Sequence, residues 1–440
     1  MKNKRTFVLR LTVFGFFVSA FVLSLRPAFA EQWNVFDPRA MAMGGTGVAS
    51  SNGAVGDYWN PATLGEADNP SGFQLPVGAH ANIAGDVLQG ASDLQNIYSS
   101  CGSGQGGAFC LALSQSQIQT GLNELTGPGN GALANAGAGA DFKFGHLAFF
   151  VNELAYGGAQ GELNGVTASQ IYNHIANGAY LSNNPYLAAR ALSTTEVGFG
   201  YGHELPWVPG LSVGGNLKAI MGYTGYDNNC LFTSNANMAG CSNANGGGKL
   251  ALKNALQESV APAVDLGALW DVDQAFKWMP FHPKIGVTGR DINDPTFALS
   301  PTAIAEGAPG QMALGGNVRA GVEISPFHWW NISADCDLTR NTTLVDGLLY
   351  QMAGIGTEVN VFNRPWMNLA LRAGLEQNLA APSSDLIATG GFGLNIFHLM
   401  IDLGVQITPQ MQYINTSSSG SGSQQIPSDI AGSFQIGLMF

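Results

Sequence analysis

Apolar and polar residues alternate along most of the chain, from about residue 70 to the C-terminus. In the last segment, from Ile430 to Phe440, the apolar residues occupy every second position. In segment 330–339, Asp335 and Asp337 share one face, whereas Cys336 lies on the other. A period of two places successive side chains on opposite faces of a β-strand. The pattern therefore predicts strands with one apolar face and one face in contact with water.

The alternating segments predict about fourteen strands. They lie near 72–84, 132–144, 145–157, 194–205, 209–224, 259–273, 280–291, 311–325, 328–342, 348–362, 366–379, 385–397, 398–409 and 428–440. The connections between them are short on one side and mostly long on the other. Outer-membrane β-barrels have tight periplasmic turns, longer outer loops and an even number of strands. The sequence therefore predicts an all-β fold, a membrane-spanning antiparallel β-barrel.

Aromatic residues gather beside the short connections. The set comprises Phe142, Phe144, Trp207, Trp278, Trp329, Trp330, Trp366 and Phe397. Aromatic rings favour the headgroup level of a bilayer, so this set predicts the periplasmic girdle of a barrel. The last strand ends on Phe440, and we expect the barrel-assembly machinery to recognise this strand. Within the long connections, 111–126 and 167–192 have a helical pattern, and 417–425 is a low-complexity loop.

The composition and the N-terminus favour the same class. Charged residues make up 11% of the chain, against about 25% in soluble domains. The first thirty residues combine a basic start, an apolar run from Leu11 to Leu25, and the small-x-small pattern of Ala28-Phe29-Ala30. We therefore expect a signal peptide at 1–30, and a mature protein in the outer membrane of a Gram-negative bacterium, in contact with its lipid.

The charge balance and the polar motifs exclude several classes of function. Without the five basic residues of the signal peptide, 13 Lys and Arg stand against 30 Asp and Glu. Such a surface repels nucleic acid. The seven histidines are dispersed, and no HExxH motif or serine–histidine nucleophile pair is present. We therefore expect no enzyme activity, no metal site and no cofactor.

Four of the five cysteines bracket two short loops in an exported chain. Cys101 and Cys110 enclose one loop, and Cys230 and Cys241 enclose the other. An oxidising compartment permits disulfides, so these spacings predict two local bridges, with free thiols as the alternative. Cys336 is left over.

Charged residues occupy inward positions of several predicted strands. They are Lys218, Arg319, Glu323, Asp335, Asp337, Glu358, Arg372 and Glu376. Asp402 is expected to share the same lumen. Two readings follow: these groups pair with one another along a hydrated wall, or they bind a substrate. Mixed signs on one wall favour pairing.

The segment from Met41 to Leu64 is rich in glycine and nearly free of charge. Its GGTG stretch, residues 44–47, could suggest a dinucleotide-binding loop. That motif requires a preceding strand and a following helix, and Asn60-Pro61 breaks a helix here. Small residues permit compact packing instead, so we expect this segment to fold inside a narrow polar lumen.

The stretch RAMAMGGTGVASSNGAVGDYWNPATL resembles the N-terminal hatch of the FadL/TodX family of outer-membrane transporters for hydrophobic compounds. The resemblance is greater to a subgroup described as conjugal-transfer TraF-like proteins, and it extends to IGVTGRDINDPTF. It implies a hatch at 31–70 that plugs a barrel at 71–440. The hatch motif would comprise Gly44, Gly45, Gly47, Asn60, Pro61 and Ala62, with the Asn-Pro-Ala turn near the periplasmic side.

In that family, the third strand has an inward kink that opens the wall laterally. The third predicted strand here contains adjacent polar residues, Asn152 and Glu153, so its alternation slips. A β-bulge would restore the alternation. The resemblance therefore places a candidate lateral opening at Asn152, Glu153 and Gly157. Alternatively, Glu153 lies in water at the outer rim.

Two functions remain open. The first is passive uptake of hydrophobic small molecules, such as long-chain fatty acids or hydrocarbons, through a plugged lumen with lateral exit. The second is a structural or assembly role in a conjugation or secretion apparatus, mediated by the outer loops or the hatch. The plug-like N-terminus favours transport, and the long connections at 158–193 and 225–258 favour the second role.

Overall fold

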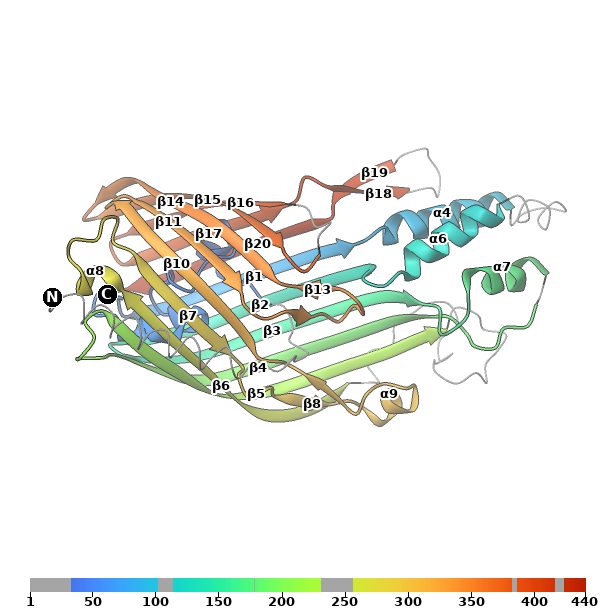
Figure 1. Cartoon of the computed structure of the whole chain (residues 1–440), viewed down its shortest axis with the longest axis horizontal. Coiled ribbons are helices and arrows are strands. Elements are labelled where there is room, and N and C mark those ends of the chain that lie inside the picture. Colours follow the sequence, from blue (N-terminus) through green and yellow to red (C-terminus); the bar gives the residue numbers. More distant parts are fainter. Residues whose placement is uncertain (1–32, 102–113, 178, 231–255, 382–385, 416–422) are drawn as a thin grey trace, which may run out of the picture.

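The computed structural model describes residues 33–101, 114–177, 179–230, 256–381, 386–415 and 423–440. Fourteen antiparallel strands form a closed barrel, in which the last strand pairs with the first (Figure 1). The predicted fold class is confirmed. The predicted signal peptide lies outside the described residues.

The strands of the barrel follow one another around the wall in chain order. They are β1 (Gly72–Ala84), β2 (Gly131–Phe144), β3 (Leu147–Glu162), β4 (Tyr186–Glu204), β5 (Leu211–Cys230), β6 (Gln257–Asp271), β7 (Lys284–Arg290), β10 (Asn317–Phe327), β11 (Trp330–Asp337), β14 (Met352–Arg364), β15 (Met367–Asn378), β16 (Ile387–Ile396), β17 (Leu399–Ile407) and β20 (Asp429–Met439). Each overlaps a strand expected from the period of two, because one face meets the surroundings and the other the lumen.

The remaining elements lie in the connections or in the N-terminal segment. Short strand pairs are β8 (Thr296–Ala298) with β9 (Gln311–Ala313), β12 (Asn341–Thr342) with β13 (Leu349–Tyr350), and β18 (Met411–Asn415) with β19 (Ser423–Pro427). The helices are α2 (Pro38–Ala42), α3 (Gly56–Trp59), η1 (Pro61–Gly65), α4 (Val87–Cys101), α6 (Gln115–Thr126), α7 (Ala168–Asn177), α8 (Val272–Ala275) and α9 (Pro301–Ala305). No helix in the described ranges is long and apolar enough to cross a bilayer.

Several expected elements have the wrong extent. The predicted strand at 311–325 is two strands, β9 and β10, because Gly315-Gly316 interrupts the alternation. The predicted helix at 167–192 stops at Asn177, and Tyr186 already belongs to β4. Pro185 disfavours helical backbone at Asn184, so the predicted helix cannot continue through this point. Two other predicted strands also divide. The strand predicted at 328–342 divides into β11 and β12, and the strand predicted at 348–362 divides into β13 and β14. Of the low-complexity loop 417–425, residues 423–425 belong to β19 and the rest lies outside the described residues.

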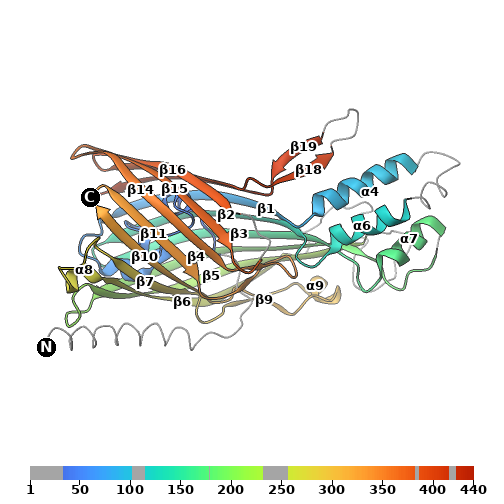
Figure 2. The ribbon, with the colours of Figure 1, turned by 45° about the horizontal axis from the view of Figure 1, so that its top comes forward.

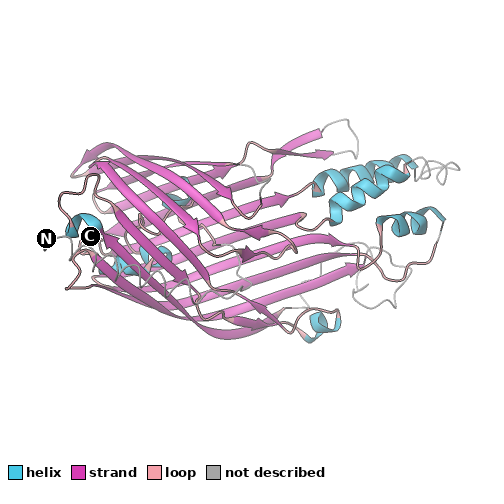
Figure 3. Cartoon of the chain, in the orientation of Figure 1, coloured by secondary structure: helices cyan, strands magenta, loops and turns pink. Residues whose placement is uncertain are grey.

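The two ends of the barrel differ. The short turns, α8 and the C-terminus lie at one end, which we call the short-turn end (Figure 1). Helices α4, α6, α7 and α9 and the β18–β19 hairpin project from the opposite, long-loop end (Figure 2). Figure 3 shows the same division, with strands in the wall and the larger helices beyond it. The expected alternation of short and long connections is therefore present.

The outward face of the wall is apolar, and its aromatic residues are exposed near the short turns. Exposed rings at this end include Phe144, Trp207, Trp278, Trp366, Phe397 and Phe440. Farther from the short turns, aliphatic side chains such as Val77, Leu371 and Ile436 are exposed on the wall. Membrane β-barrels have an outward apolar band flanked by aromatic girdles, and this surface has that distribution.

The N-terminal segment, residues 33–70, lies inside the barrel. Helix α2 contacts β15, β16, β17 and β20, whereas η1 contacts β4, β5 and β6 on another part of the wall. Its side chains Phe36, Met43, Trp59 and Leu64 are fully buried. This is the segment for which the sequence predicts a hatch, and its position brings it into contact with the inward polar residues of the wall.

Candidate functional site

The glycine-rich stretch fits against the wall backbone at Gly44 and Gly45. Both have left-handed φ angles, 69° and 70°. A Cβ atom on Gly44 would lie 2.5 Å from the carbonyl oxygen of Leu375 on β15. The Gly44 amide donates to Thr389 Oγ1 on β16 at 2.9 Å. Any larger residue here would combine backbone strain with a collision, so the position requires glycine.

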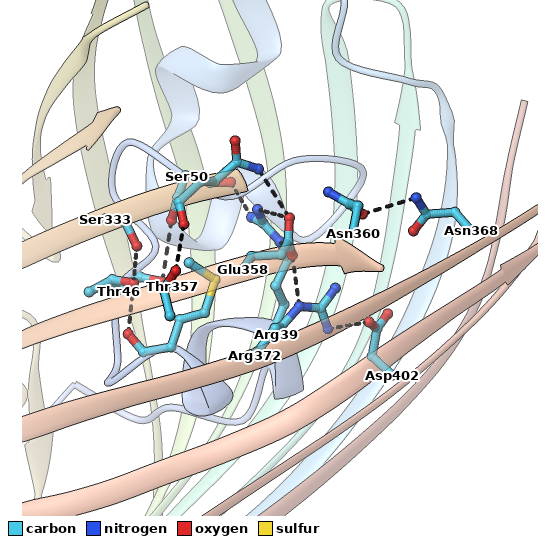
Figure 4. A network of polar contacts seen from close by, with 12 residues as sticks. Arg39, Thr46, Ser50, Ser333, Thr357, Glu358, Asn360, Asn368, Arg372 and Asp402 are labelled. Atoms are coloured by element: carbon cyan, nitrogen blue, oxygen red, sulfur yellow. Dashed lines mark hydrogen bonds and ion pairs between the residues drawn. The ribbon is translucent and has the colours of Figure 1, made fainter. Parts of the chain in front are cut away.

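The next residues of this stretch bind a carboxylate of the wall. Asp335 Oδ2, on β11, accepts hydrogen bonds from the backbone amides of Gly47 (2.7 Å) and Val48 (2.9 Å). Ser333 lies two residues before Asp335 on β11, and its Oγ is 2.6 Å from Thr46 Oγ1 (Figure 4). Consecutive backbone amides make a local anion site. The GGTG stretch therefore binds an anion, which is a side chain of the barrel and not a phosphate.

The Asn60-Pro61-Ala62 turn lies near the short-turn end. Asn60 Oδ1 accepts from the Ala62 amide at 3.0 Å and caps η1. Its Nδ2 donates to the Val48 carbonyl at 3.0 Å and to the Ala268 carbonyl on β6 at 3.2 Å. A Cβ atom on Gly214 of β5 would be 2.2 Å from the Pro61 carbonyl oxygen. A glycine on the inner wall thus makes room for this turn.

Arg39, on α2, connects the N-terminal segment to a charged network of the wall (Figure 4). Its Nε donates to Glu358 Oε2 on β14 at 2.9 Å, and its Nη1 donates to the Ser50 carbonyl. Arg372 on β15 also binds Glu358, at 2.7 Å, and reaches Asp402 on β17 at 2.5 Å. The four charges alternate in sign, as the sequence analysis expects for a wall of paired groups.

A second network surrounds Lys218 on β5. Its Nζ lies 2.7 Å from Asp291 Oδ1, 3.0 Å from Asp265 Oδ1 and 3.3 Å from Glu196 Oε2. Arg290 binds Glu196 at 2.7 Å. Glu196, Asp265, Arg290 and Asp291 were not among the lumen charges predicted from the sequence. Two signals were available: Arg290-Asp291 belong to the IGVTGRDINDPTF stretch, and Glu196 is inward by the alternation of its strand.

The arginines of the wall also face the aromatic rings of the N-terminal segment. The guanidinium carbon of Arg290 is 4.0 Å from the ring centre of Tyr58. That of Arg319 on β10 is 5.1 Å from the Trp33 ring and 5.8 Å from the Trp59 ring. Arg319 is held by Asp337 at 2.6 Å. Desolvated cation–π contacts of this kind stabilise the position of the segment.

Toward the long-loop end, an apolar layer fills the lumen above the charged networks. Its centre is the buried aromatic group of Trp33, Phe36, Tyr58 and Trp59. Inward residues of the wall in this layer are Leu133, Leu154, Tyr156, Leu192, Ile220, Ala261 and Ala263, and residues of the connections are Phe297, Leu314, Leu344 and Val345. This layer was not predicted from the sequence, although the alternation that identifies the inward charges also identifies its wall residues.

Two cavities lie at different levels of the lumen. One, of about 430 Å³, lies at the short-turn end and is lined mainly by polar residues, among them Glu66, Lys284 and Glu323. The other, of about 520 Å³, lies toward the long-loop end, among residues such as Ile83, Leu348 and Tyr350. The N-terminal segment contributes to the lining of the first cavity.

The remaining predicted lumen charges also lie inward. Glu376 is buried, and its Oε1 is 2.8 Å from the position that a Cβ atom on Gly45 would take. Glu323 faces the cavity at the short-turn end. No group of three or more His, Cys, Asp or Glu side chains that could hold a metal occurs within the described parts of the chain.

The expected bulge in the third strand is wrong. Strand β3 pairs with β2 from Leu147 to Ala159 and with β4 from Leu147 to Glu162, without a register shift. Asn152 is buried on the inward face. Glu153 is on the outward face, where Ser193 Oγ donates to it at 2.8 Å. Adjacent polar residues on a strand can serve its two faces, so no slip is needed. The lateral opening at Asn152, Glu153 and Gly157 stays a prediction.

The predicted disulfides also stay predictions. Cys101 ends α4 and Cys230 ends β5, but Cys110 and Cys241 lie outside the described residues. Cys336, the cysteine without a predicted partner, is a free thiol on β11 and is half-buried.

Together, the closed barrel of fourteen strands and the N-terminal segment inside it define a plugged outer-membrane-type β-barrel. The family described as "F plasmid transfer operon, TraF, protein" matches residues 57–337. The match covers more than half of the chain, and the chain belongs to this family. The resemblance to the TraF-like subgroup of the FadL/TodX family, expected from the sequence, is confirmed. No curated protein matches the chain.

Three solved structures are similar to the chain at low sequence identity. The Pseudomonas putida toluene transporter TodX is 13% identical, with a TM-score of 0.50, over 93% of this chain and 99% of that chain. The Ralstonia pickettii toluene transporter TbuX is 15% identical, with a TM-score of 0.47, over 92% and 98%. A Pseudomonas aeruginosa FadL homologue is 11% identical, with a TM-score of 0.47, over 94% and 99%. At such identities, the likeness concerns the fold.

Proposed function

We propose that the protein is an outer-membrane channel for passive uptake of hydrophobic small molecules, such as long-chain fatty acids or hydrocarbons. Residues 33–70 act as its hatch. The ligand enters among the outer loops at the long-loop end and passes the hatch. It leaves into the periplasm at the short-turn end, or sideways through the wall near Asn152, Glu153 and Gly157.

The apolar layer in the lumen carries this proposal. Water-filled outer-membrane channels have a polar interior. Here, Leu133, Leu154, Leu192 and Ile220 point inward and are buried around the aromatic rings of the N-terminal segment. An apolar ligand gains about 25 cal/mol for each Å² of apolar surface that it removes from water, so such a layer offers it affinity without polar recognition. TodX, whose fold is similar, is described as a toluene transporter.

The localisation rests on three observations. The outward face of the barrel is apolar, exposed aromatic rings surround the short-turn end, and the chain begins with the pattern of a signal peptide. The terminal strand β20 ends next to Phe440, whose backbone amide donates to the Ser71 carbonyl at 2.9 Å. This strand would be the segment that the barrel-assembly machinery recognises.

Uptake by liposomes that contain the purified protein tests the function. We expect faster entry of an alkane, an aromatic hydrocarbon or a fatty acid than into empty liposomes. Leu192→Asn places an amide in the apolar layer and should slow entry about tenfold, because an unpaired buried polar group costs about 1–3 kcal/mol. Leu386→Asn changes an exposed leucine in the same way and should leave uptake unchanged. Equal rates of entry into liposomes with and without the protein would contradict the proposal.

A role in a conjugation apparatus is a second candidate, because the matching family is described by a plasmid transfer operon. The supporting feature is a helical group beyond the barrel, in which Ile118, Leu122, Ile171 and Tyr172 form a small apolar core between α6 and α7. Crosslinking in conjugating cells tests this role. Repeated capture of one apparatus protein, together with no uptake in liposomes, would favour it over transport.

A further inference from the structure

The cavity at the short-turn end has an unequal set of charged groups. Its lining contains seven acidic residues, which are Asp37, Glu66, Asp68, Asp271, Glu323, Glu358 and Asp402. It contains three basic residues, which are Arg39, Lys284 and Arg372. The cavity lies between the N-terminal segment and the short turns, where a transported molecule would arrive after passing the hatch.

Each of the three cations already binds a carboxylate. Arg39 binds Glu358 at 2.9 Å, and Arg372 binds both Glu358 and Asp402 (Figure 4). Lys284 binds Glu66 at 2.5 Å. A ligand with a carboxylate would therefore have to displace an existing partner, and it would meet the surplus of acidic groups.

The same cavity offers hydrogen-bond acceptors that are open. Gln435 on β20 is 1% exposed and lines the cavity, and its Oε1 has no hydrogen-bond partner among the described residues. The same holds for Asn395 Oδ1 on β16 and Glu323 Oε2 on β10, which also line it. Gln435 lies directly opposite Asp402 on β17. Buried acceptors of this kind require a donor.

Apolar side chains line the cavity near Gln435. Met400 on β17 and Met439 on β20, which is also the strand of Gln435, are part of the lining. Met400 is buried at 6% exposure. Methionine side chains adapt to irregular apolar ligands. This part of the cavity therefore fits a molecule with an apolar body and one hydrogen-bond donor.

We infer that this cavity selects neutral hydrophobic molecules with a hydroxyl group, such as phenols and alcohols, over carboxylates of the same size. The hydroxyl donates to Gln435 Oε1, and the apolar body lies against Met400 and Met439. This inference rests on the proposed function and narrows its substrate class, because it places fatty-acid anions among the disfavoured ligands.

Equilibrium dialysis against the full-length protein in nanodiscs tests this selection, with binding to empty nanodiscs subtracted. The probes are 4-propylphenol, propylbenzene and 4-propylbenzoate, which share one apolar body. We expect the phenol to bind about tenfold tighter than the benzoate, because the acidic groups of the cavity repel a carboxylate. The phenol should also bind tighter than propylbenzene, because it makes one additional hydrogen bond. Benzoate that binds as tightly as the phenol would overturn the inference.

Two variants identify the groups responsible. Gln435→Leu removes the acceptor at similar volume, and should lower the affinity for the phenol to that for propylbenzene. Glu323→Gln removes one negative charge, and should reduce the discrimination against the benzoate; it keeps the test valid if Gln435→Leu fails to fold. Gln412→Leu, at a buried glutamine that lines the other cavity, is the matched control and should leave the affinities for all three probes unchanged. Unchanged phenol affinity in a folded Gln435→Leu protein would contradict the inference.

Liposome uptake of propylbenzene separates this inference from the proposed function. If propylbenzene enters but the protein shows no preference for the phenol, only the inference on selectivity fails. If neither propylbenzene nor another apolar probe enters faster than into empty liposomes, the proposed function itself fails.

Discussion

Asp57, on α3 of the N-terminal segment, is a carboxyl group in the interior of the barrel, 1% exposed. Asn216 Nδ2 donates both to the backbone carbonyl of Asp57 and to Asp265 Oδ2, each at 3.2 Å, so the two acidic residues lie near one another. Burial raises the pKa of Asp57 to about 7, and the negative charge of Asp265 adds to the shift, which the positive charge of Arg290 opposes. The folded segment therefore favours a proton on Asp57.

The docking of the N-terminal segment should weaken as the pH rises. In the unfolded chain, an aspartate has a pKa of about 3.9. The higher value in the folded state means that stability is fully present below about pH 4 and is lost as the pH rises through about 7. Hydrogen exchange of residues 54–64 should be faster at pH 8 than at pH 5. Asp57→Asn should abolish this difference, and Asp68→Asn, at an exposed carboxylate of the same segment, should retain it.

Gly44 gives a second prediction at this scale. Gly44→Ala should destabilise the docked segment by about 1–3 kcal/mol, because the residue has positive φ and touches the wall backbone. Limited proteolysis of the segment should become faster. Gly310→Ala is the matched control, because a Cβ atom there meets nothing within 4 Å. Equal proteolysis of the two variants would show that the close approach at Gly44 contributes no stability.

Individual residues differ in how well the sequence predicts them. The inward direction of Arg319, Asp337 and Arg372 follows from parity alone, because a strand has only two faces. Their partners do not follow, because pairing depends on the register between strands and on the path of the N-terminal segment. The binding of Asp335 to the amides of Gly47 and Val48 is such a case: neither the strand nor the loop identifies it separately.

At the scale of elements, the period of two identifies the barrel strands, and glycine or proline determines where the expectation fails. Strands such as β15 and β20 have uninterrupted alternation, and their expected and observed bounds agree closely. Where Gly315-Gly316 or Pro185 interrupts the pattern, the expected element was too long. The adjacent polar residues of β3 indicate a bulge only if both face water. In the structure, Asn152 and Glu153 lie on opposite faces of the strand.

Helix α2 gives a prediction for a whole element. Arg39→Met should release it from the wall, at a cost of up to about 3 kcal/mol, because Glu358 then loses one of its two arginine partners in a buried network. Hydrogen exchange of residues 38–45 should accelerate, while that of β14 should change little. Arg364→Met, at an exposed arginine at the end of β14, is the control and should leave α2 protected. If α2 remains equally protected in both variants, this ion pair does not hold the segment.

The whole molecule has a layered lumen. A cavity lies at the short-turn end and is lined in part by the Arg39 network, which holds the N-terminal segment, and an apolar layer lies toward the long loops. A ligand that crosses this lumen must displace part of the N-terminal segment, since rings such as Trp59 occupy its centre. We therefore expect this segment to close an otherwise open barrel.

Ion conductance in planar bilayers tests that closure most directly. The intact protein should be nearly silent, and a variant without residues 33–66 should show steady conductance, because the wall remains closed by its own strand pairing. Heat-modifiable gel mobility checks that the variant still forms a barrel. Steady conductance of the intact protein, or silence of a correctly folded deletion variant, would contradict the account.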